Sequence, residues 1–108
     1  MKDDKIYIQH ILEAIARVER YLAGFDFQAF DCSEIAQAAV VRELEIVGEA
    51  ARKLSADFLA SLPEVAWQDI KDMRNKLIHE YFDVDTELVW KTAREDLPQL
   101  KKALASHK

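Results

Sequence analysis

Glycine and proline are scarce in this sequence, with only two of each among 108 residues. Hairpins and other tight turns draw heavily on these two residue types, so their scarcity favours helices joined by short connections. The single cysteine, Cys32, excludes an internal disulfide and fits a reducing cytoplasm. No apolar run approaches the ~20 residues that cross a bilayer, and the N-terminal stretch "MKDDKIYIQH" is too polar for a secretory signal. We therefore expect a cytoplasmic protein that does not enter a membrane.

Basic residues are also in short supply, because 15 Lys and Arg face 20 Asp and Glu, which gives a net charge of -5. A protein that coats nucleic acid is usually basic, so any contact with nucleic acid must be local and small, or absent. Half of the residues are hydrophobic and 32% are charged, which is an ordinary globular composition. This length and composition predict one domain over residues 1–108.

Apolar residues recur every three or four positions, which predicts an all-α, up-and-down bundle of four or five helices. The expected helices cover residues 4–23, a long stretch from Asp31 or Ser33 to Leu54, 65–78, and a segment that starts at Asp85 or Thr86. Residues 55–64 are expected to form one short helical turn plus a connection. Pro98 is expected to kink the last helix or to begin a fifth.

The long second helix carries apolar residues on more than one face. Ile35, Val40, Leu44 and Val47 are assigned to its main stripe, whereas Ile46 lies off that stripe. A helix of this kind is buried on more than one side, either by its own chain or by a second subunit.

The stretch "RNKLIHEYF", residues 74–82, gathers Arg74, Asn75, His79 and Tyr81. Arg74 can hold a phosphate with two hydrogen bonds, and His79 can transfer a proton near neutral pH. These are the groups that metal-free cleavage of RNA needs when its own 2′-OH is the nucleophile. Arg74 and His79 are five residues apart, or about 140° around a helix, so we expect the helix to end near His79 and let Arg74, His79 and Tyr81 converge. The alternative is that they are ordinary surface or capping residues.

The same residues resemble the Arg-polar-x3-His-x-Tyr pattern of HEPN domains, and the chain as a whole is similar to HepT-type toxins. The resemblance also includes "RELEIVGEAARKL" (residues 42–54), "MRNKLIHEYFDVD" (73–85) and "DLPQL" (96–100), and so covers nearly the whole chain in order. It implies that Arg74 and His79 are a catalytic pair, supported by Asn75 and Tyr81.

The resemblance further implies a metal-independent endoribonuclease that acts as a toxin and needs no cofactor. Its expected partners are an RNA substrate, a second copy of itself in a homodimer or larger assembly, and a minimal nucleotidyltransferase antitoxin. That antitoxin is expected to silence the toxin by adding AMP to Tyr81. Lys71 and Lys76 are expected to join Arg74 in a small basic cleft for RNA. The competing interpretation is a non-catalytic helical partner, or a nucleotide-binding subunit of the nucleotidyltransferase.

Other polar and aromatic residues have simpler interpretations. Glu49 could orient a site residue or lie in solvent, and Trp67 and Trp90 are expected in the core or at a dimer interface. His10 and His107 lack the spacing of metal ligands, and the sequence predicts no metal site.

Overall fold

The computed structural model describes residues 4–79 and 84–107, without the side chains of Arg74 and of residues 76–79. Over this range every regular element is a helix, so the predicted all-α bundle is confirmed. In chain order the elements are α1 (Asp4–Tyr21), α2 (Phe27–Asp31), α3 (Glu34–Arg52), α4 (Ala56–Ser61), α5 (Trp67–His79), α6 (Thr86–Lys91), the π-helical turn η1 (Thr92–Asp96), α7 (Leu97–Leu104) and the 3₁₀ turn η2 (Ala105–His107).

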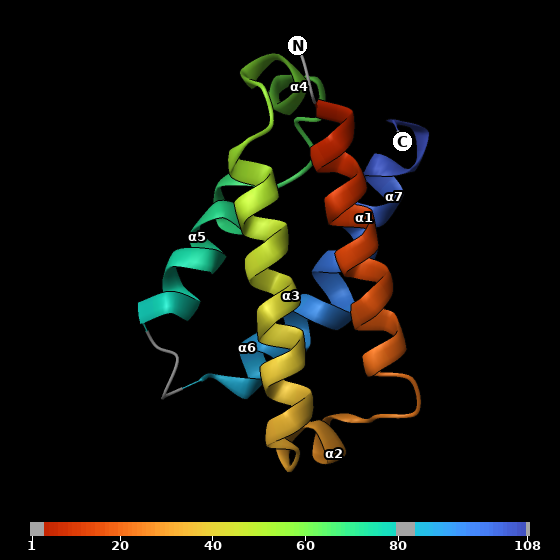
Figure 1. Cartoon of the computed structure of the whole chain (residues 1–108), viewed down its shortest axis with the longest axis vertical. Coiled ribbons are helices and arrows are strands. Elements are labelled where there is room, and N and C mark those ends of the chain that lie inside the picture. The colour runs from red at the N-terminus through yellow and green to blue at the C-terminus, as the bar shows by residue number, and fades with distance from the viewer. Residues whose placement is uncertain (1–3, 80–83, 108) are drawn as a thin grey trace.

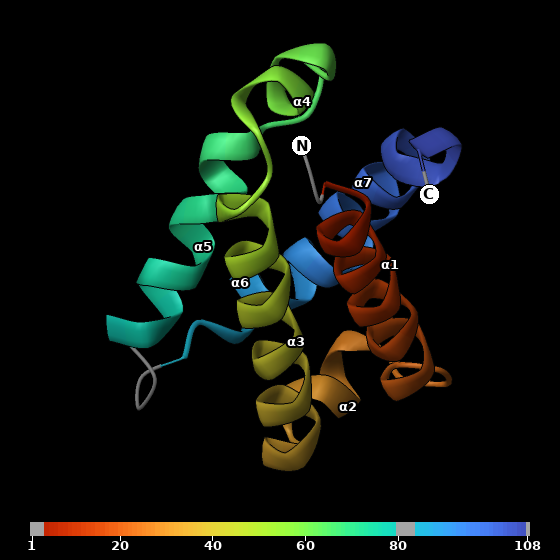
Figure 2. The same cartoon turned by 45° about the horizontal axis from the view of Figure 1, so that its top comes forward.

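The long helices α1 and α3 run antiparallel and form the front of the molecule (Figure 1). The C-terminal helices α6 and α7 cross behind them, and α5 lies on the other side of α3 from α1 (Figures 1 and 2). Helix α5 packs chiefly along α3, whereas α7 also packs against α1. The helix that carries "RNKLIH" is therefore held mainly from one side.

Side-chain caps explain where several helices begin. The Oγ of Ser33 accepts the N–H of Ala36 at the start of α3, and Oδ1 of Asp85 accepts the N–H of Leu88 at the start of α6. Such caps satisfy backbone donors that the first turn leaves free. Gly24 follows α1 with a φ of +82°, in the left-handed region that favours glycine after a helix. Helix α2 was not predicted, although Asp26 caps it through the N–H of Ala29.

The core is formed where α1, α3 and the C-terminal helices meet. Phe30 of α2 is fully buried against the ring of Trp90, which also contacts the ring of Phe27. Trp67 is also buried, so its predicted place in the core is confirmed. The buried apolar residues of α1 and α3 are Ile8, Ile11, Ala14, Ile15, Val18, Ala36, Val40, Leu44, Val47, Ala50 and Ala51.

The assignment of Ile35 to the buried stripe of the second helix was wrong, because this residue is 86% exposed. At ~100° per residue, Ile35 lies roughly 150° from the mean direction of Val40, Leu44 and Val47. It therefore belongs to a second face of α3, the face that also holds the half-buried Ile46.

Pro98 lies in the first turn of α7, so it begins a new helix, which is one of the two expected outcomes. The turn before it is π-helical over Thr92–Asp96. A proline removes one hydrogen bond and crowds the carbonyl four residues earlier, and a wider turn relieves that crowding. No helix in residues 4–79 and 84–107 is both long enough and apolar enough to cross a membrane.

Candidate functional site

Helix α5 carries most of the residues predicted for the site. It spans Trp67–His79, close to the predicted 65–78, so Lys71, Arg74, Asn75, Lys76 and His79 all lie on it. Asn75 is exposed and Lys71 is half-buried. Tyr81 lies outside the described residues, as do the side chains of Arg74, Lys76 and His79.

The backbone of α5 is helical from Arg74 to His79, and this fixes their relation along the helix. Five residues correspond to a rise of about 7.5 Å and a rotation of about 140°. A substrate that bridges both residues would thus have to pass around the helix rather than lie along one stripe. The predicted convergence of Arg74, His79 and Tyr81 depends on side chains and residues outside the described range, so it stays a prediction.

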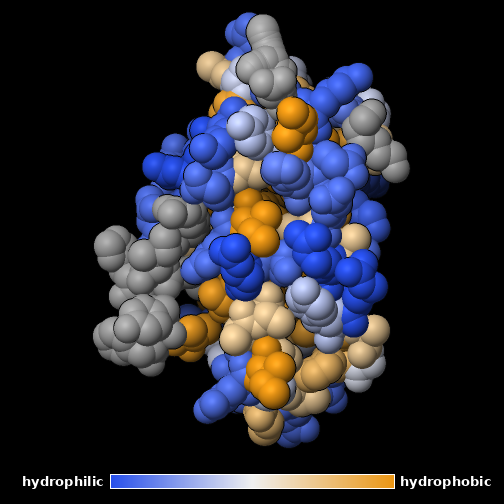
Figure 3. Space-filling view, in the orientation of Figure 1, coloured by the Kyte–Doolittle hydropathy of each residue, from blue (hydrophilic) through white to orange (hydrophobic). Residues whose placement is uncertain are grey.

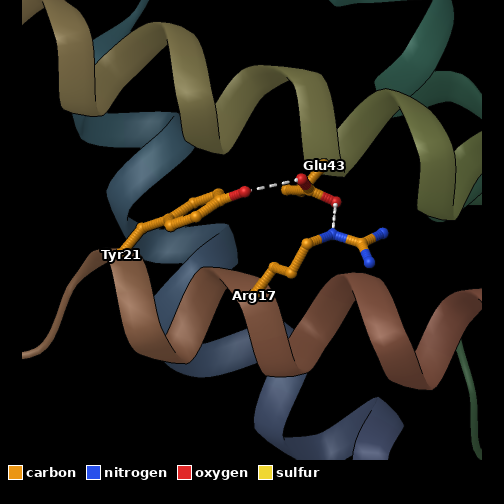
Figure 4. Close-up of polar contacts among 3 residues, drawn as sticks. All are labelled: Arg17, Tyr21 and Glu43. Atoms are coloured by element: carbon orange, nitrogen blue, oxygen red, sulfur yellow. Dashed lines mark hydrogen bonds and ion pairs between the residues drawn. The ribbon is translucent and has the colours of Figure 1, made fainter.

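A buried carboxylate joins α1 to α3 and was not predicted. Glu43 is charged but only 5% exposed, because it lies in the middle of the core stripe of α3. Its Oε1 accepts a hydrogen bond from Nε of Arg17 at 2.9 Å, and its Oε2 accepts one from the hydroxyl of Tyr21 at 3.2 Å (Figure 4). Two donors from α1 thus compensate a charge that would otherwise be costly to bury.

This network could have been found from the spacing of Glu43, which lies three residues after Val40 and four before Val47. A glutamate on a buried stripe needs a partner, and α1 supplies an arginine and a tyrosine four residues apart. The Nη atoms of Arg17 point away from Glu43 (Figure 4). Its side chain is 33% exposed, so the cation lies at the surface end of the network.

The remaining polar candidates, Glu49, His10 and His107, make local contacts with neighbouring side chains. Glu49 is exposed and its Oε2 lies 3.7 Å from Nζ of Lys53, an ion pair within one helix. His10 packs edge-on against Tyr7, and His107 packs in the same way against Phe58. In the part of the chain that the structure describes, no three His, Cys, Asp or Glu side chains are grouped to hold a metal ion.

The indole of Trp90 contacts two phenylalanine rings and one arginine. Its indole lies 5.3 Å from the ring of Phe30 and 6.0 Å from that of Phe27, measured between centroids. The guanidinium of Arg94 lies 5.0 Å from the centroid of the same indole, in a cation–π contact. The ring is therefore occupied on several sides, which agrees with a packing role.

Comparisons with known proteins give a consistent result. A family model described as "Ribonuclease HepT-like" matches residues 11–106. The chain is 43% identical over 100 residues to "Probable ribonuclease HepT" of Thermococcus cleftensis, covering 93% of this chain and 91% of that protein. It is 39% identical over 101 residues to "Putative RNase MJ1380" of Methanocaldococcus jannaschii, covering 94% of this chain and 93% of that one. No solved structure matches at a significant level.

Proposed function

This chain belongs to the HepT-like ribonuclease family, and we propose that it is a metal-independent endoribonuclease in which Arg74 and His79 cut RNA. The observation that carries the proposal is the placement of both residues on α5, within the family match. Arginine and histidine are the two side chains that phosphodiester cleavage needs when no metal supplies charge.

The proposed reaction uses the 2′-OH of the RNA as its nucleophile. The 2′-oxygen loses its proton and forms a bond to phosphorus, and the bond from phosphorus to the 5′-oxygen breaks. The leaving 5′-oxygen gains a proton, so the products are a 2′,3′-cyclic phosphate and a 5′-OH. His79 moves a proton in this sequence, while Arg74 stabilises the charge that builds on the phosphoryl oxygens. Lys71 and Lys76 are expected to bind the neighbouring phosphates.

The test is cleavage of RNA by the purified protein in the presence of EDTA. We expect His79→Ala to lower the cleavage rate by about 10²–10⁴-fold, the usual contribution of one proton-transfer group. Arg74→Ala should lower it by about 10²–10³-fold, the usual contribution of one group that stabilises the charge of the transition state. His107→Ala and Arg20→Ala are matched controls on exposed or peripheral positions, and they should cut at the normal rate. Circular dichroism checks that each variant keeps its helices. If His79→Ala and Arg74→Ala remain fully active and toxic, the ribonuclease assignment is wrong and a non-catalytic partner role takes its place.

The proposal includes a toxin role with a nucleotidyltransferase antitoxin that modifies Tyr81. The phenol oxygen would attack the α-phosphate of ATP and release pyrophosphate, which leaves AMP on the tyrosine. The new phosphate carries a negative charge that Arg74 can pair with, and the adenosine then covers the site. Intact-mass measurement after incubation with the nucleotidyltransferase and ATP should show AMP on wild type and on Tyr7→Phe, but not on Tyr81→Phe. AMP addition to Tyr81→Phe would contradict the assignment.

The proposal also includes a homodimer, supported by the second face of α3. Ile35 is 86% exposed and Ile46 is half-buried on that face. In the space-filling view of this side of the molecule, hydrophobic patches along α3 are interrupted by hydrophilic side chains (Figure 3). A single exposed isoleucine is ordinary on a protein surface, so the support comes from two isoleucines that share one face of a long helix. Sedimentation should show a dimer that Ile35→Glu weakens at least tenfold, whereas Ile6→Glu on the 51% exposed Ile6 of α1 leaves it intact.

A further inference from the structure

A cavity of roughly 460 Å³ lies between α5 and the C-terminal helices. Helix α3 forms its floor, α5 one wall, and η1 with α7 the other. The apolar part of the lining includes Leu44, Val47, Ile70, Met73, Leu97 and Leu100. Small-molecule sites in proteins have this size and this predominantly apolar lining.

Three of the six polar residues that line the same cavity are acidic. Glu64, Asp69 and Asp96 contribute three carboxylates, against one ammonium from Lys91. Nζ of Lys91 lies 3.8 Å from Oε1 of Glu95, so its charge is already partly compensated. The three carboxylates make no ion pair with any side chain that the structure describes, a set that leaves out Arg74 and residues 76–79. An occupant of the cavity therefore meets an apolar interior and a negative rim.

The two walls each contribute one of these carboxylates. Asp69 lies in the first turn of α5, and Asp96 is the last residue of the π-helical turn. A cation in the cavity would be attracted by a carboxylate of each wall. RNA is disfavoured at this rim, because its phosphates would meet three carboxylates of the same sign.

We propose that this cavity binds a small organic cation, whose apolar body lies against α3 and whose ammonium group lies between Asp69 and Asp96. The site is separate from the proposed ribonuclease reaction and does not depend on it. Because α5 is held mainly by α3, a ligand in contact with both α5 and α7 joins two parts of the bundle that otherwise have few contacts. A ligand that binds the folded chain alone also raises its unfolding temperature.

Three probes with one eight-carbon body and different head groups test the proposal. These are n-octylamine, which is protonated at pH 7, neutral n-octanol and anionic octanoate. Isothermal titration calorimetry on the full chain should give one octylamine per chain, with octanol bound about tenfold more weakly and octanoate weaker still. Octylamine should also raise the unfolding temperature more than octanol does. Equal affinities for octylamine and octanoate, or no octylamine binding at millimolar concentration, would overturn the proposal.

Variants of the lining residues test whether the probes bind in this cavity. They also separate the contribution of the carboxylates from that of the apolar lining. The double variant Asp69→Asn, Asp96→Asn should bind octylamine no better than octanol, while octanol binding stays unchanged. Asp72→Asn alters a carboxylate on the same helix that does not line the cavity, and it should keep the preference for octylamine. Ala103→Phe fills the cavity from α7 and should abolish binding of both probes.

Ala66→Phe fills the cavity from the side of α5 and should also abolish binding of both probes. If one of the two filling variants fails to fold, the other can still be measured. If octylamine binds both filling variants as well as wild type, the binding lies elsewhere and the proposal fails.

Discussion

Replacing Glu43 tests whether its charge is stabilised by the two donors from α1. Glu43→Leu leaves the guanidinium of Arg17 and the hydroxyl of Tyr21 without the acceptors they contact at 2.9 and 3.2 Å. Removing one partner of a fully buried ion pair costs about 3–5 kcal/mol. Arg17 is 33% exposed and can recover part of its hydration, so we expect a loss of about 2–3 kcal/mol in the free energy of unfolding.

Urea unfolding followed by circular dichroism measures this loss, which corresponds to a fall of roughly 8–15 °C in the unfolding temperature. Glu43→Gln keeps the volume and one acceptor, so it should cost only about 1 kcal/mol. The matched control is Glu19→Gln, which breaks an exposed ion pair of 3.0 Å with Lys101 and should cost less than about 1 kcal/mol.

The double variant Arg17→Met, Glu43→Leu completes a mutant cycle. The hydroxyl of Tyr21 loses its acceptor in both variants, but the double variant no longer leaves the cation of Arg17 without its carboxylate, so it should be more stable than Glu43→Leu alone. If Glu43→Leu were no more destabilising than Glu19→Gln, the network would not stabilise the fold and the argument would be wrong.

Three further substitutions should each lower the free energy of unfolding, measured by urea titration. Phe30→Ala removes a fully buried ring between α2 and Trp90 and should cost about 3–5 kcal/mol; a cost below 1 kcal/mol would contradict its place in the core. Gly24→Ala should cost about 1–2 kcal/mol from backbone strain at φ +82° alone, since a Cβ there meets no atom within 4 Å; no loss would refute the strain. Ser33→Ala removes the cap of α3 and should cost about 1 kcal/mol, whereas the exposed Ser106→Ala should cost nothing measurable.

The starts of the main helices could be predicted from local chemistry. Ser33 and Asp85 were both among the predicted starting residues, and each side chain accepts a backbone N–H three residues on. Capping is decided within four residues, so it can be deduced before the tertiary structure is known. Helix α2 was missed because it is only five residues long, too short for a helical period to show in the sequence.

Features that depend on two distant segments could not be predicted in the same way. The spacing of Glu43 on the buried stripe of α3 shows that it needs a partner, but only the packing of α1 against α3 shows that Arg17 and Tyr21 supply it. The exposure of Ile35 follows from which face of α3 the other helices cover. The cavity depends on the distance between α5 and α7, and no local pattern sets that distance. The roles of Arg74, His79 and Tyr81 come from the family and stay predictions.

The antiparallel pair α1 and α3 also has a consequence for the order of folding. Only residues 22–33 separate these two helices, so the entropy lost in closing their connection is small. By contrast, α7 must return to α1 from the other end of the chain, where Lys101 meets Glu19 across 82 residues. We expect α1 and α3 to pair in the transition state and α7 to dock after it. In stopped-flow experiments, Val40→Ala on α3 should then slow refolding, whereas Leu104→Ala on α7 should mainly speed unfolding.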